Sequence, residues 1–221
     1  MPSSPSSEKM SPVEIRATAG LAAVYGLRMF GMFIILPVFA FYAESLPGEN
    51  NYTLIGIALG AYGLTQAILQ IPFGWLSDRI GRKPVIYFGL ILFALGSFIA
   101  ASAEDIYWVI FGRIVQGSGA ISAAIMALAA DLTREEHRTK AMASIGMTIG
   151  TVFALSLIIA PALNRLIGVP GIFIMTGILA LLAILVVYKV IPSPQLCRFH
   201  SDTEAAPGRF INVLQDPELL R

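Results

Sequence analysis

The sequence predicts an all-α polytopic membrane protein, a bundle of six transmembrane helices. The chain is 56% hydrophobic and only 13% charged, with a mean hydropathy of +0.75, which is far from the balance of a soluble domain. Apolar stretches of about 18 residues or more recur, and each can cross a bilayer core of about 30 Å at about 1.5 Å per residue. Basic residues gather in alternate connections between these stretches.

The apolar stretches define one transmembrane domain, residues 15–191, flanked by polar tails. The expected spans are residues 17–41, 52–73, 85–103, 106–130, 141–163 and 170–191. Residues 1–14 are rich in Ser and Pro and predict a disordered cytoplasmic tail. Residues 192–221 are polar and contain proline, which is typical of the start of a cytoplasmic interdomain linker.

The positions of Lys and Arg predict the orientation of the spans. The connections after the second and fourth spans carry Arg79, Arg82, Lys83, Arg134, Arg138 and Lys140. Of the connections on the opposite side, residues 42–51 and 102–105 contain no Lys or Arg, and the last one contains only Arg165. By the positive-inside rule we expect a multi-pass protein of the cell (inner) membrane with both termini in the cytoplasm.

The connection between the second and third spans holds the most specific motif. Its eleven residues read GWLSDRIGRKP and include Gly74, Asp78, Arg79, Gly81, Arg82 and Lys83. Glycine is needed where a backbone bends or approaches another closely. The order of charges and glycines resembles the loop between helices 2 and 3 of the major facilitator superfamily. This resemblance extends from Ile15 to about Arg221 and implies the amino-terminal six-helix half of a twelve-helix transporter.

The resemblance also implies a conformational role for this motif. Asp131 closes the fourth span on the same side as Asp78 and Arg82. In the superfamily, acidic and basic residues at such positions form a charge cluster that latches the outward-facing state. The alternative is that these charges only set the topology, which is a sufficient explanation for Arg79 and Lys83.

A charge inside the hydrocarbon is costly, so Arg113 in the fourth span needs a function or a partner. It begins the run RIVQGSGA, in which Gln116 and Gly117 share its helix face. The run resembles the fourth-helix signature of the superfamily's drug:proton antiporter branch and implies a role in proton coupling. The alternative is a structural arginine that snorkels to the interface or binds a neighbouring helix.

The first and second spans supply the remaining candidate cavity residues. Arg28 lies in a stretch, RMFG, that resembles the first helix of YajR-type inner-membrane transporters, and it either lines a cavity or is structural. Tyr62, Gln66 and Gln70 recur every four residues and form one polar stripe. Such a stripe either lines an aqueous path or bonds to a neighbouring helix.

Two features limit the antiporter interpretation. The fifth span keeps Pro161 but has lost most of the glycines of the antiporter signature. The spans contain no Asp or Glu, so a proton-carrying carboxylate would come from outside this segment.

Glycines spaced by four, Gly56 with Gly60 and Gly146 with Gly150, favour ordinary packing between helices.

We therefore expect secondary active transport of a small solute by alternating access, with proton-coupled efflux. The expected partners are the lipid bilayer, a small-molecule substrate and a carboxy-terminal six-helix half, but no nucleic acid. The alternative is a truncated or half-size six-helix membrane protein without transport of its own. His137 and His200 lack further ligands at metal-binding spacing, and there is no Walker or nucleophile-elbow motif. We expect no enzymatic activity, no catalytic residue, no metal and no cofactor.

Overall fold

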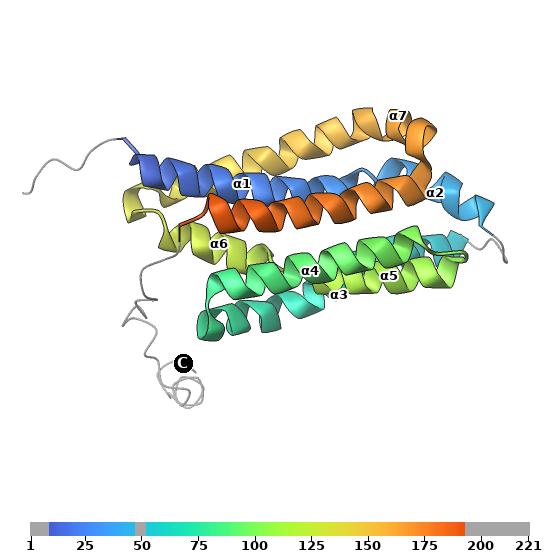
Figure 1. Cartoon of the computed structure of the whole chain (residues 1–221), viewed down its shortest axis with the longest axis horizontal. Helices are drawn as coiled ribbons and strands as arrows, with labels where there is room; N and C mark the ends of the chain where they lie inside the picture. The colour runs from blue at the N-terminus through green and yellow to red at the C-terminus, as the bar shows by residue number, and fades with distance from the viewer. Residues whose placement is uncertain (1–8, 47–51, 193–221) are drawn as a thin grey trace, which may run out of the picture.

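The chain folds into a bundle of long helices that run side by side (Figure 1). The computed structural model describes residues 9–46 and 52–192, and within these ranges every regular element is a helix. The helices are α1 (Pro12–Phe33), α2 (Leu36–Ser45), α3 (Tyr52–Ile80), α4 (Arg82–Ala101), α5 (Ile106–Ser118), α6 (Ser122–Asp131) and α7 (Glu135–Lys189). The all-α membrane class predicted by the sequence is confirmed.

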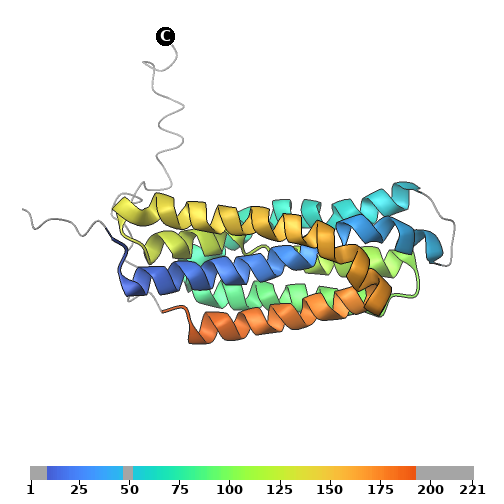
Figure 2. The same cartoon turned by 90° about the horizontal axis from the view of Figure 1, so that it is seen from above.

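Five continuous helical stretches in the described part are long and apolar enough to span a membrane, rather than the six expected. The difference lies in α7, whose 55 residues would measure about 80 Å if straight. Gly168 interrupts α7 with φ 67° and ψ 174°, and Figures 1 and 2 show the second arm running back in the opposite direction, with α1 between the two arms. The fifth and sixth expected spans are the two arms of this one helix.

Two spans are each broken into a pair of shorter helices. The first changes from α1 to α2 at Ile34 and Ile35, just before Pro37, whose missing amide hydrogen weakens the helical ladder. The second break separates α5 from α6 at residues 119–121. The carbonyl of Gly119 at this break accepts a hydrogen bond from a side chain of α1, so the break contributes directly to the polar interior.

Glycine allows α5 to approach two neighbouring helices closely. A Cβ atom added at Gly117 would collide with the carbonyl oxygen of Tyr62 in α3, and one at Gly96 in α4 would collide with the backbone of Gln116. By contrast, a Cβ at Gly56, Gly60, Gly146 or Gly150 would meet nothing within 4 Å in the described structure. The packing interpretation therefore fails for these four glycines within this chain, because no described helix covers their faces.

The expected disorder of residues 1–14 is wrong for the last three of them. Helix α1 begins at Pro12, and Ser11 with Glu14 forms a reciprocal capping box. The carboxylate of Glu14 also binds Arg134, which fixes this helix start against the connection between α6 and α7. Residues 1–8 and the expected linker beyond residue 192 lie outside the described part.

Candidate functional site

The charged motif after the second span is mostly helical instead of forming a loop. Helix α3 continues to Ile80, so Gly74 and Asp78 belong to its last turns, and α4 starts at Arg82. Gly81 alone joins the two helices, with φ 100°, a conformation that residues with a side chain rarely adopt. Because one sharp turn at Gly81 is enough to reverse the chain, the remaining residues of the motif can stay helical and extend α3 and α4.

Arg82 is the centre of the charge cluster at this junction. Its Nε atom lies 3.3 Å from Oδ2 of Asp131 at the end of α6, and its Nη1 atom contacts Oδ1 of Asp78. Nη1 also donates to Oγ of Ser77 at 2.8 Å. The structure thus brings together the three residues expected to form the gate, and Arg82 links α3, α4 and α6.

The other motif residues lie outside this cluster. The guanidinium of Arg79 stacks over the ring of Trp75 at 3.8 Å, on an exposed face. Lys83 donates to the carbonyl of Ile191 at 2.5 Å, where the chain leaves α7. Gly74 faces α6, where an added Cβ would lie in ordinary contact with Ala123 at 3.5 Å.

Arg113 is held inside the bundle by neutral groups. Its side chain is only 1% exposed and lies with its guanidinium carbon 4.7 Å from the centre of the Tyr62 ring. Nη1 donates to Oε1 of Gln116 at 2.8 Å, and Nε donates to the carbonyl of Ala58 at 3.4 Å. Gln116 in turn donates to Oγ of Ser97 at 2.8 Å. These bonds join α3, α4 and α5 through one buried network.

Arg28 is equally buried, but its hydrogen bonding is incomplete. Nη2 donates to the Gly119 carbonyl at 2.7 Å and to Oε1 of Gln66 at 3.1 Å. Its guanidinium carbon lies 5.5 Å from the centre of the Phe93 ring and 5.9 Å from that of Tyr62. Among the described residues, Nε and Nη1 of Arg28 have no hydrogen-bond partner.

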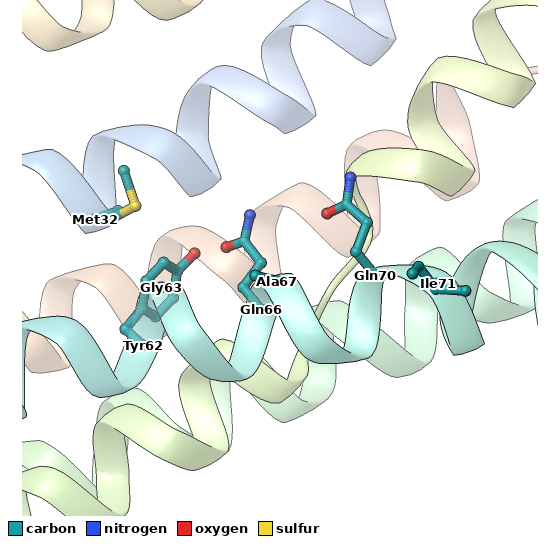
Figure 3. Close-up of a pocket in the computed structure, with 7 residues that line it drawn as sticks. All are labelled: Met32, Tyr62, Gly63, Gln66, Ala67, Gln70 and Ile71. Carbon is teal, nitrogen blue, oxygen red and sulfur yellow. The ribbon is translucent and has the colours of Figure 1, made fainter.

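The polar stripe of α3 borders a pocket of about 420 Å³. The pocket is lined by Met32, Tyr62, Gly63, Gln66, Ala67, Gln70 and Ile71. Figure 3 shows the hydroxyl of Tyr62 and the amides of Gln66 and Gln70 extending from the same side of α3. The Tyr62 hydroxyl has no partner in the described structure. The two arginines, Tyr62 and Gln66 therefore form one polar region beside this pocket.

Several residues of these networks carry no distinctive signal in the sequence. Ser122 accepts a hydrogen bond from the Tyr25 hydroxyl at 3.1 Å and lies 3.5 Å from Nε2 of Gln66. A hydroxyl residue within an apolar span is the only sequence feature that could point to Ser122, and serine is too common in helices for this feature to be specific. The pairing of Glu14 with Arg134 likewise has no distinctive signal in the sequence, and hydrogen bonding to this carboxylate raises the pKa of Arg134. In the described ranges no group of His, Cys, Asp or Glu is arranged to hold a metal ion.

Sequence comparison identifies relatives over nearly the whole chain. The chain is 50% identical over 213 residues to the inner membrane transport protein YajR of Escherichia coli, covering 96% of this chain and 47% of that protein. It is 33% identical over 144 residues to the class H tetracycline resistance protein of Pasteurella multocida, covering 64% and 35% of the two chains. The chain spans about half the length of the E. coli relative and of an uncharacterized transporter of Buchnera aphidicola.

The fold is similarly shared with solved transporters. The human organic anion transporter MFSD10 superposes with a TM-score of 0.71 at 20% identity, over 83% of this chain and 49% of that one. The family model of the Major Facilitator Superfamily matches residues 21–211. Because this match covers most of the sequence, the chain belongs to the Major Facilitator Superfamily.

Proposed function

We propose that the chain is the amino-terminal half of a secondary active transporter that exports a small solute in exchange for protons. Membrane transport follows from the family, and the relatives include an inner membrane transport protein and tetracycline resistance proteins. Beyond membrane transport, we propose that the solute is exported, that export is coupled to protons, and that the solute binds between two halves of the transporter.

The observation that carries the proposal is the pocket on α3. Its polar stripe lies on the helix with the least cover: only 17% of the most apolar stretch of α3 is buried, compared with 61% for the stretch formed by α1 and α2. A polar face left open in hydrocarbon is unfavourable. The pocket is therefore well suited to be one wall of a larger cavity between two halves.

The uncovered glycines support a second half. Gly56 and Gly60 on α3, with Gly146 and Gly150 on the first arm of α7, present small residues at a spacing of four. In lipid, such faces allow close helix–helix contact. A carboxy-terminal six-helix partner would cover both faces and close the pocket from the other side.

The charge cluster around Arg82 suits a gate that opens repeatedly. The side chains of Asp78 and Asp131 are 59% and 42% exposed, so water can replace their contacts with Arg82. Exposed ion pairs contribute only about 0–1 kcal/mol. Such a weak link can hold one conformation of a transporter without preventing the exchange to another.

In the proposed proton coupling, Arg113 interacts with a carboxylate that lies outside this chain. Because no Asp or Glu lies in the expected spans, the titrating carboxylate would belong to the carboxy-terminal half. Arg113 with Gln116 and Tyr62 would then respond to its protonation through the network that joins α3, α4 and α5.

A chimera tests this proposal directly. The chain is joined to the carboxy-terminal half of the E. coli relative, and solute-dependent proton movement is recorded in energised membrane vesicles with a pH-sensitive dye. We expect solute-dependent proton release from the chimera and none from the 221-residue chain alone, although the chain should still insert. A folded chimera without flux would favour the truncated, non-transporting protein. Saturable uptake by the chain alone would favour a self-sufficient half-size carrier.

A further inference from the structure

The guanidinium of Arg28 has more hydrogen-bond donors than acceptors around it, and its positive charge has no anion beside it in the described structure. It is 1% exposed, and the two acceptors that it uses, the Gly119 carbonyl and the Gln66 amide, are both neutral. Both of them bind the same nitrogen, Nη2, while Nε and Nη1 lack a partner among the described residues. A buried cation in this state is costly unless an anion joins it.

The described chain offers no anion to Arg28. The described ion pairs are Arg82 with Asp78, Arg82 with Asp131, Arg134 with Glu14, and Arg138 with Glu135. All of these lie at the end of the bundle where α1 and α7 begin, whereas Arg28 lies in the interior beside Tyr62 and Phe93.

Gln66 separates Arg28 from the pocket and is weakly held there. Its Oε1 accepts from Arg28 at 3.1 Å, but its Nε2 reaches Ser122 only at 3.5 Å, the outer limit of a hydrogen bond. Gln66 itself lines the pocket, as does the ring of Tyr62 that packs against Arg28. Rotation of the Gln66 side chain would therefore open a path from the pocket to the guanidinium.

We propose that this pocket binds a small amphipathic solute through its carboxylate, which replaces the Gln66 amide on Arg28. The carboxylate would accept bonds from the planar fork of Arg28, including the donors that are now unmet. The free Tyr62 hydroxyl and Gln70 offer further polar contacts, while Met32 and Ile71 receive the apolar part. This inference rests on the proposed transport function because it names the substrate class of the same cavity.

Matched solutes test the charge requirement. The full 221-residue chain, purified in detergent, is unfolded thermally with indole-3-acetate, with its neutral amide indole-3-acetamide, or with cationic tryptamine. A ligand that binds the folded chain raises its melting temperature. We expect saturable stabilisation by the carboxylate alone. Equal stabilisation by the carboxylate and the amide would overturn the proposal.

Two substitutions test the assignment to Arg28. Arg28→Gln should weaken carboxylate binding at least tenfold, whereas Arg165→Gln, the same charge change at an exposed position of α7, should retain it. If Arg28→Gln fails to fold, Gln66→Glu decides the question. This variant supplies Arg28 with an internal carboxylate, so we expect a higher melting temperature without ligand and at least tenfold weaker binding of indole-3-acetate. Wild-type binding by Gln66→Glu would overturn the proposal.

The chimera separates a solute carboxylate from a protein carboxylate. If the carboxy-terminal half supplies the anion for Arg28, the chimera will lose the preference for indole-3-acetate over its amide, and the proposal is wrong. Flux is recorded separately in the same vesicles. Carboxylate-specific binding without flux would contradict only the transport function, whereas flux of neutral or cationic solutes alone would contradict only this inference.

Discussion

Arg113 shows how this bundle holds an interior cation with neutral partners. The Gln116 amide, the Ala58 carbonyl and the face of the Tyr62 ring all direct partial negative charge toward its guanidinium. Arg28 shares the Tyr62 ring but keeps unmet donors. The two arginines therefore differ in how their donors are used: Nε and Nη1 of Arg113 each donate to an acceptor, whereas both acceptors of Arg28 bind Nη2 and leave its Nε and Nη1 without a partner in the described structure.

Two substitutions of Arg113 should show whether proton-coupled flux needs only its positive charge or also the planar shape of its guanidinium. Arg113→Ala leaves the buried Gln116 oxygen without its donor, which costs about 1–3 kcal/mol of stability. In the chimera we expect this variant to retain less than about a tenth of the proton-coupled flux. Arg113→Lys should keep a larger part because it preserves the charge but not the planar fork. Normal flux in the alanine variant would leave Arg113 with a structural role only.

The Arg82 cluster predicts a conformational effect with little loss of stability. Asp78→Asn or Asp131→Asn in the chimera should weaken the outward-facing state, because each removes one anion from Arg82. The measurement is labelling of Ala67→Cys in the pocket, with Cys197 replaced by Ser, by an impermeant reagent added from the periplasmic side. We expect slower labelling in both variants.

Glu135→Gln is the matched control for the cluster. It removes an exposed carboxylate that pairs with Arg138 at 3.6 Å and lies outside the cluster. We expect its labelling rate to match the parent protein. Unchanged rates in the Asp78 and Asp131 variants would reduce these residues to markers of topology.

At the scale of the helices, glycine serves two different purposes. Gly96 and Gly117 allow α4, α5 and α3 to meet backbone to backbone, which brings Arg113, Gln116 and Tyr62 together. Gly56 and Gly60 lie on the uncovered side of α3, where a side chain would meet open space. The same residue type therefore allows close packing inside this bundle and leaves the outer face of α3 uncovered in the described structure.

Alanine substitutions should distinguish the two kinds of glycine. In the chain alone, Gly117→Ala should lower the free energy of unfolding by about 1–3 kcal/mol, because its Cβ meets the Tyr62 carbonyl. Gly60→Ala should be neutral or stabilising by up to about 1 kcal/mol, since alanine favours the helix. Both are measured by denaturant titration in detergent. In the chimera, Gly60→Ala should become destabilising, and unchanged stability there would contradict the proposed interface.

At the scale of the whole molecule, one end of the bundle gathers the charged contacts. Glu14 binds Arg134, Arg16 donates to the carbonyl of Lys189 at 2.9 Å, and Lys83 binds the carbonyl of Ile191. Figure 1 shows the start of α1, the α3–α4 junction and the end of α7 at this same end. By the positive-inside rule this end is predicted to face the cytoplasm.

Reporter fusions test that orientation. A reporter active only in the cytoplasm should work when fused after Pro84 or Lys140, which lie at the charged end. It should fail after Glu104, in the short connection between α4 and α5 at the opposite end. Activity after Glu104 together with inactivity after Pro84 would reverse the predicted topology.

The sequence alone determined the membrane class, the apolar spans and the family motif, because hydrocarbon requires long apolar helices and imposes a charge bias on their ends. It also predicted that Asp78, Arg82 and Asp131 would meet. Only the tertiary structure decided that Glu14 is paired and that helices α3 and α4 extend through the motif up to Gly81. Tertiary packing likewise brought the Ala58 carbonyl to Arg113 and Ser97 to Gln116, and it left donors of Arg28 unmet. These buried contacts join residues of different helices, and no spacing along one helix encodes them.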